Sequence, residues 1–186
     1  MAETALVPIA NGSEDIESVT IIDVLRRAGV AVTVASVHAE ATITAARQTR
    51  ITADALITDC RDQHFDLIAL PGGMPGAQHL GESQALVAML QAQKEAGRLY
   101  GAICGAPAVA LEPNGLLSGH AATAHPGFQD RLSDQSRVSE GVVVDGHCIT
   151  SQGPGTALAF ALTLVEHLCG QAKRDEVAAP MVLPGS

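Results

Sequence analysis

The chemistry this sequence can do centres on one cysteine, in the segment Gly101-Ala102-Ile103-Cys104-Gly105-Ala106-Pro107. An apolar run precedes Cys104 and a helical pattern follows it, which predicts a sharp strand-to-helix turn. Small neighbours suit such a turn, because bulky ones would clash with a nucleophile pushed out of the sheet. We expect the N-terminus of the following helix to lower the pKa of the thiol, and backbone N–H groups at the turn to hold an oxyanion. The spacing therefore predicts a reactive thiolate at Cys104.

The alternative for each of the four cysteines is an inert, buried thiol, which is the usual state of a free cysteine. No two of them form a C-x-x-C pair, which argues against a zinc ribbon or a redox dithiol. For Cys60, Cys148 and Cys169, which have no elbow around them, the inert interpretation stands. For Cys104 the context favours reactivity.

Two further side chains are candidates for proton transfer. Glu17 lies one turn into a predicted helix that follows the first strand, where a buried carboxyl next to a thiolate should keep its proton and donate a hydrogen bond. The alternative is ordinary negative charge at a helix N-terminus. His125, in Thr123-Ala124-His125-Pro126-Gly127, is the best placed of the seven histidines for acid–base work, although a loop histidine is more often merely solvated.

A glycine-rich loop, Gly72-Gly73-Met74-Pro75-Gly76, follows another apolar run. It matches neither the dinucleotide fingerprint nor a P-loop. Its glycines fit an oxyanion-binding turn in which the backbone approaches a ligand, and equally a plain tight turn between strand and helix.

The elements that must position these residues follow an alternating pattern. Buried strands are predicted at Ala5–Ala10, Val30–Val37, Leu67–Leu70 and Leu99–Ile103, with helices between them. Ser13 is expected to cap the first helix and Gly29 to end it. Further helices are expected at Ser83–Ala96 and from Gly153 to about Gly170. Val142–Thr150 is predicted to form a hairpin that turns at Asp145-Gly146. This order predicts an α/β fold with a doubly wound, mostly parallel sheet and a hairpin excursion. In such sheets ligands bind beyond the carboxyl ends of the strands, where Glu17, Gly72 and Cys104 should meet.

Composition narrows the class of protein. The 186 residues predict a single domain over 1–186, and 47% hydrophobic but only 2% aromatic residues predict an aliphatic core. A net charge of -9 argues against nucleic acid as a partner. No basic leader and no apolar stretch long enough to cross a bilayer are evident, so we expect a soluble, cytoplasmic protein without a membrane partner.

Taken together, these motifs resemble the ThiJ/PfpI superfamily, close to the YajL-like and Parkinsonism-associated protein deglycase group. The resemblance spans about Ala5 to Val177, and its carriers in this sequence are Gly12-Ser13-Glu14-Asp15-Ile16-Glu17, Leu70-Pro71-Gly72-Gly73 with Gly76-Ala77, Ala102-Ile103-Cys104 with Pro107, and Ser151-Gln152-Gly153-Pro154-Gly155-Thr156-Ala157.

The resemblance implies a flavodoxin-like sandwich that works as a homodimer without a cofactor or metal. It implies a nucleophile at Cys104, a protonated glutamate at Glu17 and a site histidine at His125. The backbone N–H groups of Gly73 and Gly105 would be the oxyanion donors beside Gly72. A family arginine near the dimer side of the site aligns loosely with Arg47.

The activity implied is conversion of methylglyoxal or glyoxal to hydroxy acids without glutathione, with removal of early glycation adducts, as protection against carbonyl and oxidative stress. The peptidase branch of the superfamily has histidine directly after the cysteine, whereas this chain has Gly105, so a protease is disfavoured. The alternative from another class is a redox sensor or redox-regulated chaperone in which Cys104 is oxidised to a sulfinate without turnover. A flavodoxin-like binding module is the third possibility, but no phosphate or flavin fingerprint supports it.

Overall fold

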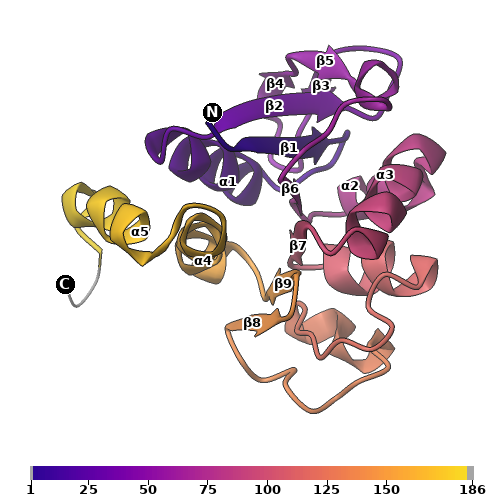
Figure 1. Cartoon of the computed structure of the whole chain (residues 1–186). Helices are drawn as coiled ribbons and strands as arrows, with labels where there is room; N and C mark the ends of the chain where they lie inside the picture. The colour runs from indigo at the N-terminus through magenta and orange to yellow at the C-terminus, as the bar shows by residue number, and fades with distance from the viewer. Residues whose placement is uncertain (1, 184–186) are drawn as a thin grey trace.

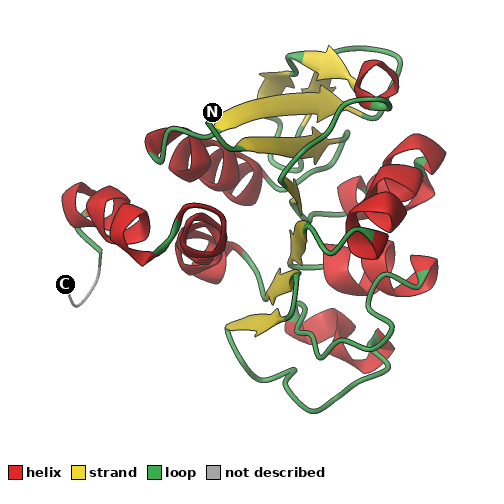
Figure 2. Cartoon of the chain, in the orientation of Figure 1, coloured by secondary structure: helices red, strands yellow, loops and turns green. Residues whose placement is uncertain are grey.

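The computed structural model describes residues 2–183, and its centre is one seven-stranded sheet with strand order β5-β2-β1-β6-β7-β9-β8. All paired neighbours in this sheet are parallel except β8 and β9, which form an antiparallel hairpin at one edge. Helices cover both faces of the sheet (Figures 1 and 2). The predicted doubly wound α/β fold with a hairpin excursion is confirmed.

The strands are short and the helices follow them in alternation. The strands of the main sheet are β1 (Thr4–Ile9), β2 (Ala31–Ser36), β5 (Ala55–Leu56), β6 (Leu67–Leu70), β7 (Leu99–Ile103), β8 (Val142–Asp145) and β9 (Cys148–Ser151). A separate hairpin joins β3 (Thr42–Thr44) to β4 (Arg50–Thr52). The helices are α1 (Asp15–Arg27), α2 (Gly76–Glu82), α3 (Gln84–Glu95), α4 (Ala157–Cys169) and α5 (Gln171–Ala178); the short turns are η1 (Ile57–Cys60), η2 (Pro107–Leu111), η3 (Glu112–Asn114), η4 (Pro126–Arg131), η5 (Pro154–Thr156) and η6 (Ala179–Met181).

The sheet separates two apolar cores. Alternate residues of β1 point to opposite faces, so that Leu6 belongs to the core under α2 and α3 while Ala5 and Val7 belong to the core under α1 and α4. Figure 1 shows α1, α4 and α5 on one side of the strands and α2 and α3 on the other. Both cores are mainly aliphatic, as the low aromatic content predicted.

The first helix begins differently from the prediction. Glu14, not Ser13, is the N-cap residue, and its Oε2 accepts from the Glu17 N–H at 2.8 Å. The Ser13 hydroxyl accepts from the Ala10 N–H instead, because the chain must first turn back over the end of β1. The predicted stop at Gly29 is confirmed by its φ of +81°, which favours glycine.

Other boundaries differ by a residue or were missed. The β8–β9 hairpin turns at Gly146-His147 rather than at Asp145-Gly146, because Asp145 pairs with Cys148. The β3–β4 hairpin and α5 were not predicted: the hairpin strands have only three residues each, and α5 is too polar to show a clear apolar face.

Within residues 2–183, no helix is long and apolar enough to cross a membrane.

Candidate functional site

The site forms where the ends of three adjacent parallel strands meet. The loops after β1, β6 and β7 carry Gly12, Gly72 and Cys104 respectively, and β6 lies between β1 and β7. Strand order reverses at β1, since β2 lies on one side of it and β6 on the other, and such reversals open a crevice at the strand ends. The structure thus brings the predicted loops together.

Cys104 occupies a strained backbone conformation. Its φ is +66°, a region that non-glycine residues rarely adopt and that is often found at functional sites. Two hydrogen bonds hold the turn: the Cys104 N–H donates to the Ser151 carbonyl oxygen at 3.0 Å, and the His125 N–H donates to the Cys104 carbonyl oxygen at 2.7 Å. The residue is half-buried, unlike Cys60 and Cys148, which are buried.

Backbone donors point at this sulfur. The N–H groups of Gly73 and Gly105 lie close enough to the Cys104 sulfur to favour the thiolate and so to lower the pKa of the thiol. When the sulfur attacks a carbonyl carbon, the negative charge develops on the carbonyl oxygen, next to the sulfur and near the same two donors. This is the arrangement that was predicted for an oxyanion hole.

Glu17 is fully buried and meets the same sulfur from α1. One carboxyl oxygen, Oε2, accepts from the Gly72 N–H at 2.8 Å. The other, Oε1, is buried and accepts no conventional hydrogen bond within residues 2–183, and the Cys104 thiol is the group with which the carboxyl interacts. A proton on Glu17 would satisfy this oxygen by donating to the sulfur.

The titration of Cys104 and Glu17 is that of a coupled pair. Burial, opposed by the Gly72 N–H, raises the pKa of Glu17 to about 7, and burial together with the charge of Glu17 raises the pKa of the Cys104 thiol to about 12. The Gly73 and Gly105 N–H groups act in the opposite direction on the thiol. Since the two groups titrate as a pair, loss of the first proton leaves the site with one proton, which can reside on the carboxyl or on the sulfur.

This result corrects the expectation that a helix N-terminus lowers the pKa of the thiol. The segment after Cys104 is a short π-helical turn, η2, that begins only at Pro107, and burial and the Glu17 charge outweigh the two backbone donors. The thiolate form of the site therefore depends on the proton moving to Glu17.

Three segments of the chain approach one another so closely at position 72 that only glycine fits there. A Cβ on Gly72 would lie 2.5 Å from the Cys104 Cβ, 2.8 Å from the Ile103 carbonyl oxygen and 3.0 Å from Glu17 Oε2. Gly73 has a φ of +86°, and a Cβ there would lie 2.4 Å from the Gly12 carbonyl oxygen. Both positions therefore require glycine, because a side chain at either one would collide with a neighbouring segment.

His125 lies beside Cys104 through its backbone, but its ring is exposed. The ring Nδ1 accepts from the Gly127 N–H at 3.1 Å, which leaves Nε2 to carry the proton of the neutral ring. The ring borders a cavity of about 260 Å³ lined also by Gln152, Gly153 and Thr156. Cys104 is not among the residues that line this cavity, and within residues 2–183 no hydrogen bond joins the His125 ring to the cysteine.

Arg47 lies in the turn between β3 and β4, at the margin of the site. Its backbone N–H donates to Asp15 Oδ2 at 2.7 Å, and its side chain is exposed. The adjacent Ala46 N–H donates to the Ser13 carbonyl oxygen at 2.8 Å, which ties this hairpin to the loop that precedes α1. The structure therefore places Arg47 near the loop, but no side-chain contact with Cys104 supports its predicted role.

Residues missed by sequence reasoning hold the site together. Glu14 caps α1 and so orients Glu17, and its own N–H donates to the Gly72 carbonyl oxygen at 2.9 Å. The sequence pattern that could have identified this cap is a carboxylate, Glu14, at the start of a helical pattern, with a second carboxylate, Glu17, three residues later.

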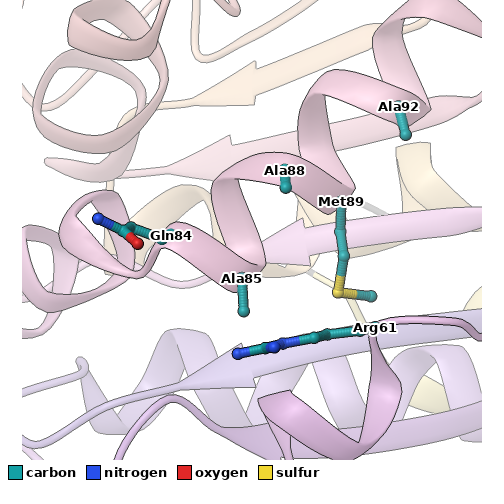
Figure 3. A pocket seen from close by; sticks show the side chains of 6 residues that line it. All are labelled: Arg61, Gln84, Ala85, Ala88, Met89 and Ala92. Atoms are coloured by element: carbon teal, nitrogen blue, oxygen red, sulfur yellow. The ribbon is translucent and has the colours of Figure 1, made fainter.

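A different cavity, of about 390 Å³, lies between η1 and α3 and shares no residue with the Cys104 site. Figure 3 shows the Arg61 side chain extended beneath Ala85 and Met89 of α3. No cluster of three or more metal-ligating side chains occurs in the described part of the chain.

Comparisons with known proteins agree with this geometry. Residues 3–167 match the model of the DJ-1/PfpI family. Protein DJ-1 homolog B of Arabidopsis thaliana is 48% identical over 168 residues, which are 90% of this chain but 38% of that protein, so the chain spans well under half of this relative's length. The glutathione-independent glyoxalase DJR-1.2 of Caenorhabditis elegans is 35% identical, over 92% of this chain and 91% of that protein.

Solved structures show the same fold. The oxidized DJ-1 of Toxoplasma gondii superposes with a TM-score of 0.96 at 43% identity, over 98% of this chain and all of that one. A family model that covers most of the chain and relatives of this similarity confirm the resemblance seen in the sequence. The chain belongs to the DJ-1/PfpI family.

Proposed function

We propose that this protein is a glutathione-independent glyoxalase that converts methylglyoxal or glyoxal to the corresponding hydroxy acid without a cofactor or metal. The observation that carries the proposal is the set of groups around one sulfur: the Gly73 and Gly105 N–H groups near the Cys104 thiol, and Glu17 Oε1, which has no conventional hydrogen-bond partner within residues 2–183. A relative is named for this activity.

The first step needs a thiolate and a proton donor at once. When the proton of the pair is on Glu17, Cys104 is a thiolate and can add to the aldehyde carbon, forming a C–S bond. The aldehyde oxygen takes up a proton from the carboxyl group, which gives a hemithioacetal. The Gly73 and Gly105 N–H groups stabilise the negative charge on that oxygen as the bond forms.

The second step moves hydrogen between the two carbons of the substrate. Ionised Glu17, whose pKa of about 7 suits a group that both takes and gives protons near neutral pH, removes the proton from the carbon that bears sulfur. The resulting enediolate is protonated on the neighbouring carbon, with the His125 Nε2–H as a donor to its oxygen. The product is a thioester, and water then breaks the C–S bond to release the hydroxy acid and restore the thiol.

The rest of the assignment follows from the same site. Loss of early glycation adducts is a consequence of removing free dicarbonyl, since depletion of the aldehyde reverses hemithioacetals by mass action. In this proposal Gly72 lets the loop reach the substrate, and Arg47 lies at the rim of the site on the side of the dimer partner.

The protein is further proposed to be a homodimer. Ile16 and Val19 on α1 are 56% and 51% exposed, and an apolar pair of this kind fits a homodimer interface. A single domain and a cytoplasmic location stay predictions.

The test is the formation of lactate from methylglyoxal by the purified protein without glutathione, in a buffer free of primary amines. Cys104→Ser should abolish turnover, and Glu17→Gln should lower it by at least a hundredfold because proton transfer is lost. Cys169→Ser, which changes another half-buried cysteine outside the site, is the matched control and should be fully active. A Cys104→Ser variant with wild-type activity would rule out the mechanism.

The second candidate is a redox sensor in which Cys104 is oxidised to a sulfinate. Two observations favour it. Glu17 Oε1 accepts no conventional hydrogen bond within residues 2–183 and, once protonated, can donate to a sulfinate oxygen, and the chain is similar to a Toxoplasma gondii structure described as oxidized. Mass spectrometry after limited peroxide treatment measures this oxidation. A protein that makes no lactate while Cys104 oxidises ahead of Cys169 supports the sensor and excludes the glyoxalase.

A further inference from the structure

A pair of histidines outside the proposed mechanism flanks the loop that supports the oxyanion donors. His38 follows β2 and His79 lies on α2, and their ring centroids are 5.1 Å apart in an edge-to-face arrangement. Both side chains are half-buried. The His38 Nε2 accepts a hydrogen bond from the Asn11 backbone N–H at 3.0 Å.

This hydrogen bond exists only while the ring is neutral. An imidazole nitrogen accepts when it is unprotonated, whereas imidazolium has two donors and no acceptor. Asn11 is otherwise held through Thr44, whose N–H donates to Asn11 Oδ1 at 2.9 Å and whose carbonyl oxygen accepts from the Gly12 N–H at 2.9 Å. Within residues 2–183, His38 therefore supplies one of three hydrogen bonds that hold Asn11 and Gly12, and its loss would loosen this segment without unfolding the protein.

The same loop lies directly against the oxyanion donors. The Gly12 carbonyl oxygen packs on Gly73 so closely that a Cβ there would be 2.4 Å away, and the Glu14 N–H donates to the Gly72 carbonyl oxygen at 2.9 Å. On its other side, a Cβ on Gly12 would lie 2.6 Å from Pro75 Cδ. Because the two segments pack this closely, we expect a shift of Asn11 and Gly12 to displace Gly73.

We propose that His38 is a positioning residue for the site. Its neutral ring accepts from the Asn11 N–H and keeps the loop from Asn11 to Glu14 against Gly73. Protonation of the ring breaks this hydrogen bond and displaces the Gly73 N–H. The device lowers the activity of the protein in acid. It rests on the proposed function only for its kinetic consequence, since the structural coupling can be measured without turnover.

The groups around His38 set the pH at which the contact is lost. Burial and the neighbouring His79 on α2 lower the pKa of His38, and the Glu40 carboxylate in the loop after β2 opposes them. The Asn11 N–H, from the loop after β1, also favours the neutral ring because it donates to Nε2. The contact should therefore break at a lower pH than the one at which a free histidine is half protonated.

The direct test is a pH titration of the ¹⁵N-labelled protein by NMR. The Asn11 and Gly73 amide signals should move with the same midpoint as the His38 ring, and His79→Gln should raise that midpoint. In His38→Gln both amides should stop responding at that midpoint, because an amide oxygen can accept from Asn11 at any pH. His167→Gln, a change in an exposed histidine on α4, should leave the titration as in the wild type.

The kinetic test compares variants at each pH, so that the titration of Cys104 and Glu17 cancels. The ratio of kcat/KM of His38→Gln to that of the wild type should be near one at pH 8 and rise to about fivefold in acid, the equivalent of one hydrogen bond. His38→Phe, which cannot accept, should be about fivefold slower than the wild type at pH 8 and equal to it in acid.

Amide signals of Asn11 and Gly73 that do not follow the His38 ring would overturn the inference, as would a ratio that is independent of pH. If the amides follow the ring but no form of the protein converts methylglyoxal, the structural coupling stands and the proposed glyoxalase activity fails.

Discussion

Replacing Glu17 by glutamine should make the protein more stable while it removes turnover. The carboxyl group is fully buried, and burial is the largest cause of its raised pKa of about 7. Glutamine has the same shape and stays neutral. Its amide oxygen can accept from the Gly72 N–H, and its NH₂ group would replace Oε1, which accepts no conventional hydrogen bond within residues 2–183.

The size of the gain follows from the difference between the pKa of the folded protein, about 7, and the ordinary value of 4.5. Below pH 4.5 both the folded and the unfolded wild type bind the proton, so the carboxyl costs nothing. As pH rises from 4.5 to 7 the unfolded chain loses the proton while the folded chain keeps it, and the free energy of unfolding falls. At about 1.4 kcal/mol for each pH unit of the window, the loss reaches about 3 kcal/mol above pH 7. Glutamine escapes this loss entirely.

Urea unfolding followed by circular dichroism at pH 4.5 and pH 8 measures the effect. The two proteins should have similar midpoints at the lower pH, and Glu17→Gln should exceed the wild type by about 3 kcal/mol at pH 8. Glu166→Gln, at an exposed position on α4, is the matched control and should change stability by less than about 0.5 kcal/mol at both values. A Glu17→Gln protein no more stable than the wild type at pH 8 would refute the argument that burial of this carboxyl is costly.

Gly72→Ala should reduce kcat by more than a hundredfold, because the new Cβ would lie 2.5 Å from the Cβ of Cys104. In the control Gly105→Ala, the new Cβ meets only the edge of the Phe128 ring at 3.5 Å and the backbone N–H is kept, so kcat should stay within about fivefold of the wild type. Steady-state kinetics on correctly folded variants measures both, and equal losses of kcat would contradict the steric argument. In the wild type, kcat/KM should rise about tenfold per pH unit up to about pH 7 and then level off, because the singly protonated pair of Cys104 and Glu17 is the active form. A pH–rate profile that is flat between pH 5 and 8 would show that this pair does not control the rate. Ile16→Asp should convert the expected homodimer to a monomer, because it places a charge at an exposed apolar position of α1. Sedimentation velocity measures the oligomeric state, and a wild type that is already monomeric would disprove the dimer.

The parts of the fold that local pattern determines were predicted correctly. The apolar runs that became β1, β2, β6 and β7 were found within a residue or two, because strands inside a parallel sheet are mostly buried and therefore mostly apolar, although β2 is exposed at its first residue, Ala31. The glycine stop of α1 was found because a left-handed residue at a helix end leaves a clear mark in the sequence. In contrast, β3 and β4 are three-residue strands that are stable only through their contacts with the rest of the chain, so no local pattern announces them.

The site shows the same division. The sequence alone determined which residues are available: a cysteine with small neighbours, a glycine pair after a strand, and a carboxyl near a helix start. Only the tertiary structure decided that Glu17 and Gly72, 55 residues apart, share a hydrogen bond, that Cys104 has a φ of +66°, and that the pKa of its thiol rises instead of falling. The reason is physical: residue type and spacing are local, whereas burial, charge proximity and backbone strain arise from segments far apart in the chain that meet only when the sheet assembles.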